Sequence, residues 1–177
     1  MNTVVVTGIG PRTGTSFIMQ KAKEAGLPIY GNKFLDGITI PEFNPDGYWD
    51  IHPNEIVEAW FDGRLNNKIV KLWNPILKVV DQSKISRVLI LERQDKLAQL
   101  TSIEKVYEAE SKLPDNKQFI DVLNPYSILT DHILTTNEWV RKRNKNTIMR
   151  VYTEDINENL DDILVFLERG LSCQHLS

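Results

Sequence analysis

Residues 3–17 read TVVVTGIGPRTGTSF, and this stretch decides the fold. Its first five residues are apolar or β-branched and end at a glycine, which is typical of a buried strand. The residues that follow place Ile18, Met19 and Ala22 on one helical face and reach Gly26, a typical C-terminal cap. A strand, a glycine-rich turn and a helix are therefore predicted in direct succession. The first amides of such a helix point outward and favour an anion.

The rest of the chain alternates apolar runs with stretches of helical period. Strands separated by helices predict an α/β fold, with three α/β/α layers, a mostly parallel central sheet and right-handed crossovers. Residues 31–54, rich in Gly, Pro, Asn and Asp, are expected to form a long functional loop. The further expected strands are 27–31, 67–73, 86–93 and 146–152, and the expected helices are 53–63, 74–83, 95–112, 125–143 and 154–170.

Composition limits the class of protein. The 177 residues, 41% of them hydrophobic, suit one domain over residues 1–177. A net charge of -3 argues against a general nucleic-acid binder, which needs many basic residues on one face. Cys173 is the single cysteine, so a disulfide framework is excluded and a reducing compartment is favoured. With no signal-peptide pattern and no apolar run near about 18 residues, we expect a cytoplasmic protein without a membrane span.

The glycine turn has several possible uses. A nucleotide hydrolase or kinase of the Walker type needs G-x-x-x-x-G-K-S/T, but Thr15 stands between Gly14 and Ser16 where that lysine belongs. A dinucleotide fingerprint through Gly8, Gly10 and Gly14 needs an acidic residue about 20 positions on, at the end of the second strand. The sequence there is IYGNK, which has none. A turn that merely joins strand and helix remains an alternative.

Residues 10–16, GPRTGTS, resemble the 5′-phosphosulfate loop of the P-loop sulfotransferase family. The family pattern is P-R/K-S-G-T-T/S after the first strand; Thr13 replaces the usual serine, and Gly8 lies one residue further from Gly14 than usual. The resemblance implies the P-loop NTPase-like sulfotransferase fold and 3′-phosphoadenosine 5′-phosphosulfate (PAPS) as sulfuryl donor, with no metal required. It implies that Arg12 stabilises charge on the leaving group. The residues implied in donor binding here are Pro11, Arg12, Thr13, Gly14, Thr15 and Ser16.

Two further stretches extend the resemblance. The family carries an arginine after a central strand and a serine eight residues later, and both bind the 3′-phosphate of the nucleotide. Arg93 has Thr101 at that spacing and Ser102 beside it, although Arg93 could instead pair with Asp95. Residues 149–171 resemble a late family segment, with Thr153 as an insertion. The resemblance thus runs from residue 3 to about residue 171.

The base that accepts the acceptor's proton is sought in the long loop. Residues 44–50, NPDGYWD, resemble an N-P-x-G-Y-x-E segment of small bacterial and phage-borne sulfotransferase-like proteins, which points to Asp50. His52 is an imidazole, the side chain that ordinarily titrates nearest neutral pH, and Glu42 is a third candidate. Alternatively, residues 44–47 form a turn, and Asp50 or His52 caps the next helix.

The remaining histidines and tryptophans are expected to be structural. His132 and His175 are predicted to be surface or structural residues, and Trp60, Trp73 and Trp139 to be core residues.

Larger family members have a later basic, glycine-containing loop that closes over the nucleotide, and after residue 171 we expect no such loop in this sequence. The basic cluster 141–145, RKRNK, could substitute for it or form the solvated end of a helix. Two hypotheses follow. One is a sulfotransferase that modifies a hydroxyl or amine of a small molecule or glycan. The other is a catalytically degenerate P-loop domain that binds a nucleotide or a phosphorylated ligand.

Overall fold

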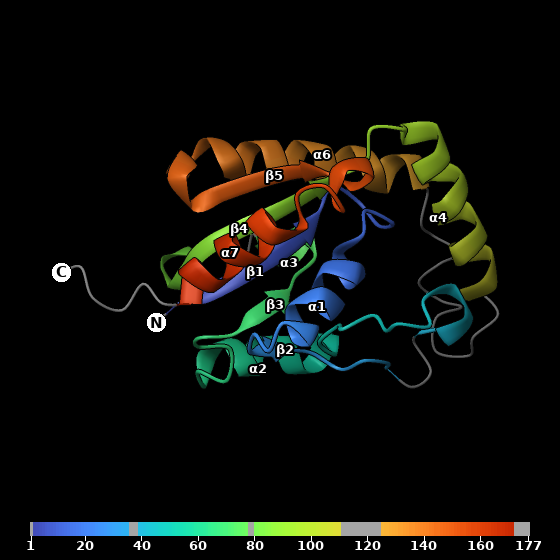
Figure 1. Ribbon diagram of the computed structural model, residues 1–177. Coiled ribbons are helices and arrows are strands. Elements are labelled where there is room, and N and C mark those ends of the chain that lie inside the picture. The colour runs from blue at the N-terminus through green and yellow to red at the C-terminus, as the bar shows by residue number, and fades with distance from the viewer. Residues whose placement is uncertain (1, 36–38, 78–79, 111–124, 172–177) are drawn as a thin grey trace.

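A parallel sheet forms the centre of the computed structural model, which describes residues 2–35, 39–77, 80–110 and 125–171 (Figure 1). In the described residues it has five strands in the order β2-β3-β1-β4-β5, and every neighbouring pair is parallel. The predicted α/β class is therefore confirmed. The strands are β1 (Thr3–Gly8), β2 (Ile29–Tyr30), β3 (Ile69–Lys71), β4 (Ile85–Glu92) and β5 (Ile148–Tyr152).

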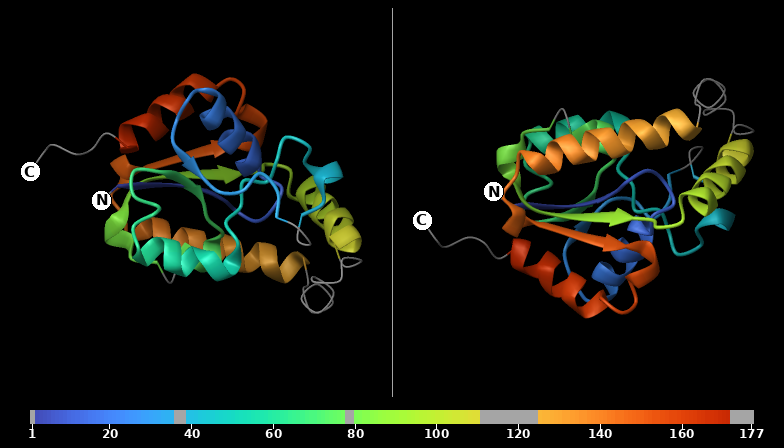
Figure 2. Two further views of the ribbon diagram at one scale, coloured as in Figure 1. Left: turned by 90° about the horizontal axis from the view of Figure 1, so that it is seen from below. Right: turned by 90° about the horizontal axis from the view of Figure 1, so that it is seen from above.

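Helices cover both faces of this sheet (Figure 2). On one face, α1 (Thr15–Glu24) and α7 (Leu160–Leu171) pack against Val4, Val6, Leu89 and Leu91. On the other face, α2 (Pro53–Phe61), α3 (Asn74–Leu77) and α6 (Pro125–Arg141) pack against alternate strand residues, including Val5. Successive strand residues point to opposite faces, so the continuous apolar run of β1 supplies both cores.

Two expected helices differ from the prediction. The last one begins at Leu160 rather than near residue 154, because residues 153–155 form the separate 3-10 turn η4 (Thr153–Asp155). The helix expected over 74–83 is α3, which ends at Leu77, and residues 82–84 form the 3-10 turn η2 (Gln82–Lys84). The other predicted helices and strands agree with the structure to within a few residues at each end.

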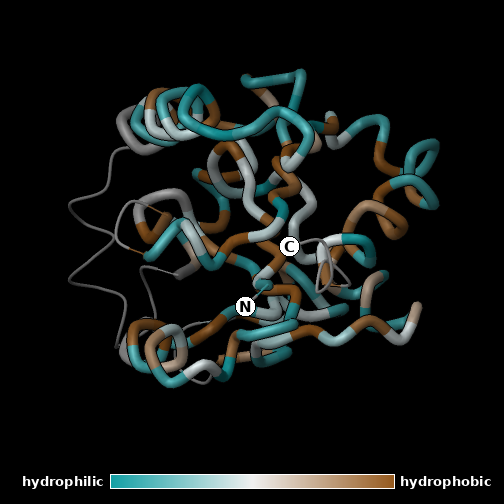
Figure 3. The backbone as a smooth tube through the Cα atoms, turned by 90° about the vertical axis from the view of Figure 1, so that its left-hand side faces the viewer, coloured by the Kyte–Doolittle hydropathy of each residue, from teal (hydrophilic) through white to brown (hydrophobic). Residues whose placement is uncertain are grey.

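The hydropathy of the backbone follows these layers (Figure 3). Apolar stretches run through the middle of the molecule, and hydrophilic stretches lie mostly along its periphery. Val4, Val5 and Val6 of β1 have no exposed surface, and neither do residues 88–91 of β4. No helix within the described ranges is long and apolar enough to span a bilayer.

The order of the strands creates a switch point between β1 and β4. The chain leaves β1 toward β2 and β3 on one side, whereas it leaves β4 toward β5 on the other. Ligands of open parallel sheets bind where such connections diverge, at the carboxyl ends of the strands. The loop after β1 and the residues after β4 meet at this place, and α4 (Lys96–Glu110) stands beyond it (Figure 2).

Candidate functional site

The loop of residues 9–14 joins β1 to α1 in an unusual backbone conformation. Gly10, Arg12 and Gly14 have φ values of 83°, 64° and 84°, all in the left-handed region. Glycine adopts this region freely, but arginine does so at a cost of about 1 kcal/mol. Strain of this kind persists at sites where the surrounding structure enforces it, which makes the loop a candidate functional element. Gly14 is the N-cap residue of α1 and has no side chain with which to cover the first helical amides.

Hydrogen bonds from the side chains of Gln99 and Thr153, which lie in two separate elements, hold this loop. The Gln99 side chain of α4, which is fully buried, donates from Nε2 to the carbonyls of Ile9 (2.9 Å) and Pro11 (2.8 Å). The Thr153 hydroxyl, at the end of β5, lies 2.9 Å from the Thr13 carbonyl and 3.3 Å from the Glu92 carbonyl. Thr153, which is an insertion relative to the sulfotransferase pattern, therefore connects the end of β4 to the loop.

Thr13 turns its side chain into the protein rather than toward a ligand. It is 1% exposed, and its hydroxyl donates to the Gly10 carbonyl at 3.3 Å. A Cβ on Gly8 would lie 1.9 Å from this hydroxyl oxygen, so a side chain at Gly8 and the observed Thr13 exclude each other. The hydroxyl of Thr13 thus shapes the turn, although the residue remains part of the cavity wall.

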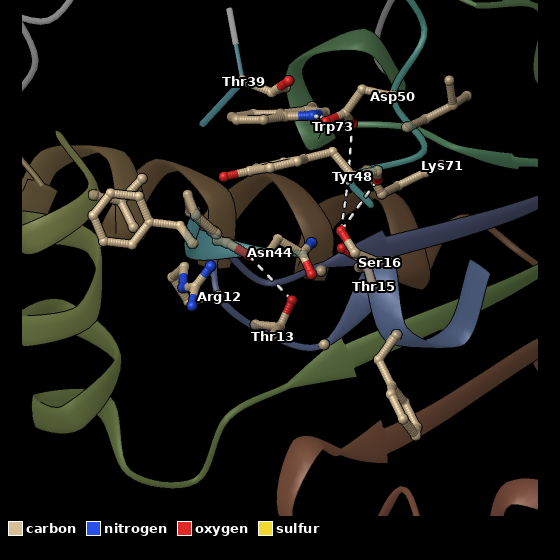
Figure 4. A pocket seen from close by; sticks show the side chains of 18 of the residues that line it. Arg12, Thr13, Thr15, Ser16, Thr39, Asn44, Tyr48, Asp50, Lys71 and Trp73 are labelled. Carbon is tan, nitrogen blue, oxygen red and sulfur yellow. Dashed lines mark hydrogen bonds and ion pairs between the residues drawn. The ribbon is translucent and has the colours of Figure 1, made fainter. Parts of the chain in front are cut away.

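A cavity of about 630 Å³ opens beside the loop (Figure 4). This volume lies within the range of small-molecule sites. Apart from the loop, its wall comes from α1, the 39–51 segment, the carboxyl ends of β3 and β4, and helices α3, α4 and α6. The lining residues used below are Gly10, Pro11, Arg12, Thr13, Gly14, Thr15, Ser16, Tyr48, Asp50, Lys71, Trp73, Ile76, Arg93, Tyr107 and His132.

Lys71, the last residue of β3, brings an ammonium group to the loop. It is 7% exposed, pairs with Asp50 at 2.8 Å, and donates to the Ser16 hydroxyl at 3.1 Å and to the Tyr48 carbonyl (Figure 4). Burial lowers the pKa of Lys71, and the charge of Asp50 opposes that shift. The loop has no lysine before Ser16, but the neighbouring strand supplies one. Sequence reasoning missed it, although a lysine inside the apolar run IVKLW was an available signal.

Of the three candidate bases, the structure brings only Asp50 to the cavity. Its Oδ1 accepts from Lys71 and also from the Trp73 indole at 3.4 Å. The His52 carbonyl accepts from the amides of residues 55 and 56, so the backbone of His52 begins α2. The His52 side chain is not part of the described cavity wall, and Glu42 is exposed on η1 (Pro41–Phe43).

Arg12 and Arg93 both line the cavity, from the loop after β1 and from the residue after β4. The Nε of Arg12 donates to the Ser102 hydroxyl of α4 at 3.0 Å. The Nε of Arg93 lies 3.8 Å from Oε1 of Glu154. The alternative prediction, in which Arg93 pairs with Asp95, is therefore wrong. Thr101 is exposed and donates to the Leu97 carbonyl one turn earlier. The structure therefore brings Ser102, but not Thr101, to Arg12.

Aromatic residues and one histidine complete the wall. Trp73 is 46% exposed and lines the cavity, so its assignment to the core was wrong, whereas Trp60 and Trp139 are core residues at 4% and 6% exposure. In Figure 4 the side chains of Tyr48 and Trp73 extend toward the same side of the site. His132 of α6 is 5% exposed and lines the cavity, which its interpretation as a surface or structural residue did not anticipate. His175 lies outside the described residues.

The basic cluster 141–145 lies at the other end of the sheet. Arg143 donates to the carbonyls of Gln82 (3.4 Å) and Ile85 (2.7 Å), where β4 begins. The cavity is at the carboxyl ends of the strands, so the interpretation that this cluster closes over a nucleotide there is wrong.

The arrangement suits the binding of an anion. Two arginines, one lysine and the first amides of a helix converge on one cavity, and guanidinium groups match phosphate geometry. Within the described ranges, no three His, Cys, Asp or Glu side chains gather to hold a metal ion. Comparison of the chain with protein-family models, curated proteins and solved structures found no match.

Proposed function

We propose that this protein is a sulfotransferase that moves a sulfuryl group from PAPS to a hydroxyl or amine of a small molecule or glycan. The observation that carries the proposal is the position of Arg12. Its left-handed backbone conformation, just before α1, presents a guanidinium group to the cavity. The loop itself carries Thr15 at the position where a Walker-type loop has its lysine. A permanently protonated group at this place can stabilise a leaving phosphate without donating a proton.

The donor would be held by its two phosphate ends. The amides of residues 14–16 at the start of α1, with the hydroxyls of Thr15 and Ser16, suit the 5′-phosphate. Arg93, directly after the neighbouring strand β4 at the switch point, suits the 3′-phosphate, and Ser102 lies on the helix α4 that follows. Lys71, which donates to Ser16, adds a third cation that was not among the residues expected from the sequence.

In the proposed reaction, the acceptor oxygen or nitrogen forms a bond to sulfur while the bond from sulfur to the bridging oxygen breaks. That oxygen keeps the electron pair and leaves as part of 3′-phosphoadenosine 5′-phosphate (PAP), stabilised by Arg12. The acceptor's proton passes to a base, for which the sequence suggests Asp50, His52 or Glu42.

Binding without catalysis is the second candidate function. The Oδ1 atom of Asp50 accepts hydrogen bonds from both Lys71 and the Trp73 indole, so it is already engaged within the protein. The Nε of Arg12 also donates to the Ser102 hydroxyl, so this nitrogen is engaged within the protein. These contacts favour a domain that binds a nucleotide or a phosphorylated ligand without turning it over.

The test of the proposed site is thermal unfolding with PAP, with ATP plus Mg²⁺, and with NAD. Because a ligand stabilises the state that binds it, PAP at about 100 times its dissociation constant should add about 2.7 kcal/mol and raise Tm by several degrees. Arg12→Ala and Arg93→Ala should reduce this shift, while Arg141→Ala, which removes the same charge from the exposed end of α6, should not. A larger shift with ATP plus Mg²⁺, or none with PAP, would refute the proposal.

Transfer of labelled sulfate from PAPS separates the two candidates. A chain that binds PAP and transfers sulfate supports the enzyme, and one that binds PAP without transfer to any acceptor supports the binding domain.

A further inference from the structure

The side of the cavity next to β3 is apolar. Trp73, two residues after this strand, leaves 46% of its surface exposed, and Ile76 of α3 lies one helical turn further on. Further apolar residues line the cavity on the same segments, and the whole set is called the apolar wall: Phe43, Tyr48, Ile51, Leu72, Trp73 and Ile76. An apolar surface of this kind gains free energy when a ligand covers it and removes it from water.

Two hydrogen bonds and an ion pair connect the apolar wall to the start of α1. The Oδ1 atom of Asp50 accepts from the Trp73 indole at 3.4 Å and from Lys71 at 2.8 Å (Figure 4). Lys71 in turn donates to the Ser16 hydroxyl at 3.1 Å. A molecule on the apolar wall therefore has its end at Asp50 close to the residues proposed to hold the 5′-phosphate of the donor.

The polar side chains beside the apolar wall are mostly engaged within their own segment. Three of them donate to nearby carbonyls: Thr39 to Leu35 (3.0 Å), Asn44 to Gly47 (2.8 Å) and Tyr48 to Ile40 (3.0 Å). Asp50 differs, because both of its side-chain contacts use Oδ1, and Oδ2 has no partner among the described residues. A sugar would leave several hydroxyls unpaired here, at a cost for each, whereas one O–H or N–H can pair with Oδ2.

We propose that the acceptor is a flat, apolar molecule with one hydroxyl or amine, rather than a sugar, and that Trp73 determines this specificity. The inference rests on the proposed function. The flat body packs against Trp73 and Tyr48, and its O–H or N–H donates to Oδ2 of Asp50. As in the reaction above, the acceptor oxygen or nitrogen bonds to sulfur, the bridging oxygen keeps the electron pair and leaves with PAP, and the proton passes to the base.

The experiment measures transfer of labelled sulfate from PAPS to 2-naphthol, tyramine and N-acetylglucosamine. We expect kcat/KM to be about 100-fold or more higher for 2-naphthol than for the sugar. Trp73→Ala should lower kcat/KM for 2-naphthol by about 10-fold or more, mainly by raising KM, because it removes binding of the flat body. Trp73→Phe keeps an aromatic ring and should retain most of the activity.

Phe61→Ala is the matched control, because Phe61 is an aromatic residue of α2 that is 78% exposed and is not among the described residues of the cavity wall. It should leave kcat/KM unchanged. The thermal shift with PAP should also be the same in Trp73→Ala as in the wild type. A smaller shift in Trp73→Ala would place the adenine of the nucleotide on the apolar wall and overturn the inference.

The other outcomes separate this inference from the proposed function. Equal or faster transfer to N-acetylglucosamine overturns the inference, and so does a kcat/KM for 2-naphthol in Trp73→Ala within about threefold of the wild type. A protein that binds PAP but transfers sulfate to none of the three probes overturns it as well and leaves the binding function. A protein that does not bind PAP refutes the proposed function itself. If Trp73→Ala does not fold, Trp73→Gln, which fills more of the space, decides by the same criteria.

Discussion

Lys71 is the residue whose environment conflicts most with its charge. Burial disfavours the ammonium form, and the single carboxylate of Asp50 only partly offsets this cost. The lowered pKa means that the folded protein binds fewer protons at this site than the unfolded chain does. The free energy of unfolding must therefore rise with pH between the folded pKa of Lys71 and the ordinary lysine value of about 10.4.

Replacement of Lys71 by methionine removes this titration. The free energy of unfolding of the wild type minus that of Lys71→Met should increase as pH rises from about 7 to 10, by at most about 1.4 kcal/mol per pH unit. Urea unfolding at a series of pH values measures it. Lys105→Met, at an exposed position on α4, provides the control and should give a flat difference. If the wild-type value minus the Lys71→Met value decreases as pH rises, the attraction of Asp50 outweighs the effect of burial on Lys71.

The sequence predicted the residues whose roles depend on local structure. Arg12, Thr15 and Ser16 follow directly from a strand and a glycine turn, so their place at the head of α1 could be read from neighbours in the chain. Lys71 and His132 could not be placed in the cavity wall in this way, because their positions there depend on which strands are adjacent and on which face of α6 meets the loop. Thr101 and Ser102 are consecutive, and only the helical phase of α4 decides that Ser102 reaches Arg12.

At the scale of elements, α4 acts as a support for the loop of residues 9–14. It contributes Gln99, which bridges two loop carbonyls, and Ser102, which holds Arg12. Both residues lie on the same side of the helix because they are three positions apart. The Oε1 atom of Gln99 is buried and has no partner among the described residues, so this side chain serves the loop through its amide donor alone.

Substitution of Gln99 tests this support. Gln99→Leu removes the donor to two carbonyls and should destabilise the protein by about 1–3 kcal/mol, with weaker binding of PAP. Gln99→Glu should cost more, because it places acceptor oxygens against the carbonyls of Ile9 and Pro11. Urea unfolding and PAP titration measure the two effects, with Glu104→Gln on the exposed face of α4 as control. Equal stability of the leucine variant and the wild type would show that the loop holds its conformation without α4.

Element boundaries were predictable where the local signal was strong. The continuous apolar runs of β1 and β4 and the glycine cap of α1 fixed those elements to within a residue or two. The start of α7 was not predicted, because residues 154–159 are mostly polar and turn-forming, and the helix begins where the amide of Ile163 donates to the carbonyl of Asn159. Ile156, in the turns before α7, already belongs to the buried apolar cluster that contains Val4 and Val6 of β1, so apolar burial alone does not mark where the helix begins.

At the scale of the whole molecule, the order of the strands creates the site. A sequence of alternating strands and helices predicts a parallel sheet, but it does not say that β3 lies beside β1 and β4 on its other side. This order brings Arg12, Lys71 and Arg93 from three separate strand ends to one cavity. It also leaves Arg143 and the basic cluster at the opposite end of the sheet.

The position of this site predicts where a bound nucleotide should restrict motion. At short labelling times, amide hydrogen exchange reports local opening rather than unfolding of the whole protein. PAP should then slow exchange at residues 10–18 and 93–102, at the carboxyl ends of β1 and β4, because it contacts or covers those amides. Residues 138–147, near the start of β4, should exchange at the same rate with and without PAP, and they serve as the internal control. Protection that is equal at both ends of the sheet, or stronger at residues 138–147, would contradict a nucleotide site at the switch point, since a ligand held there has no contact with the amino ends of the strands.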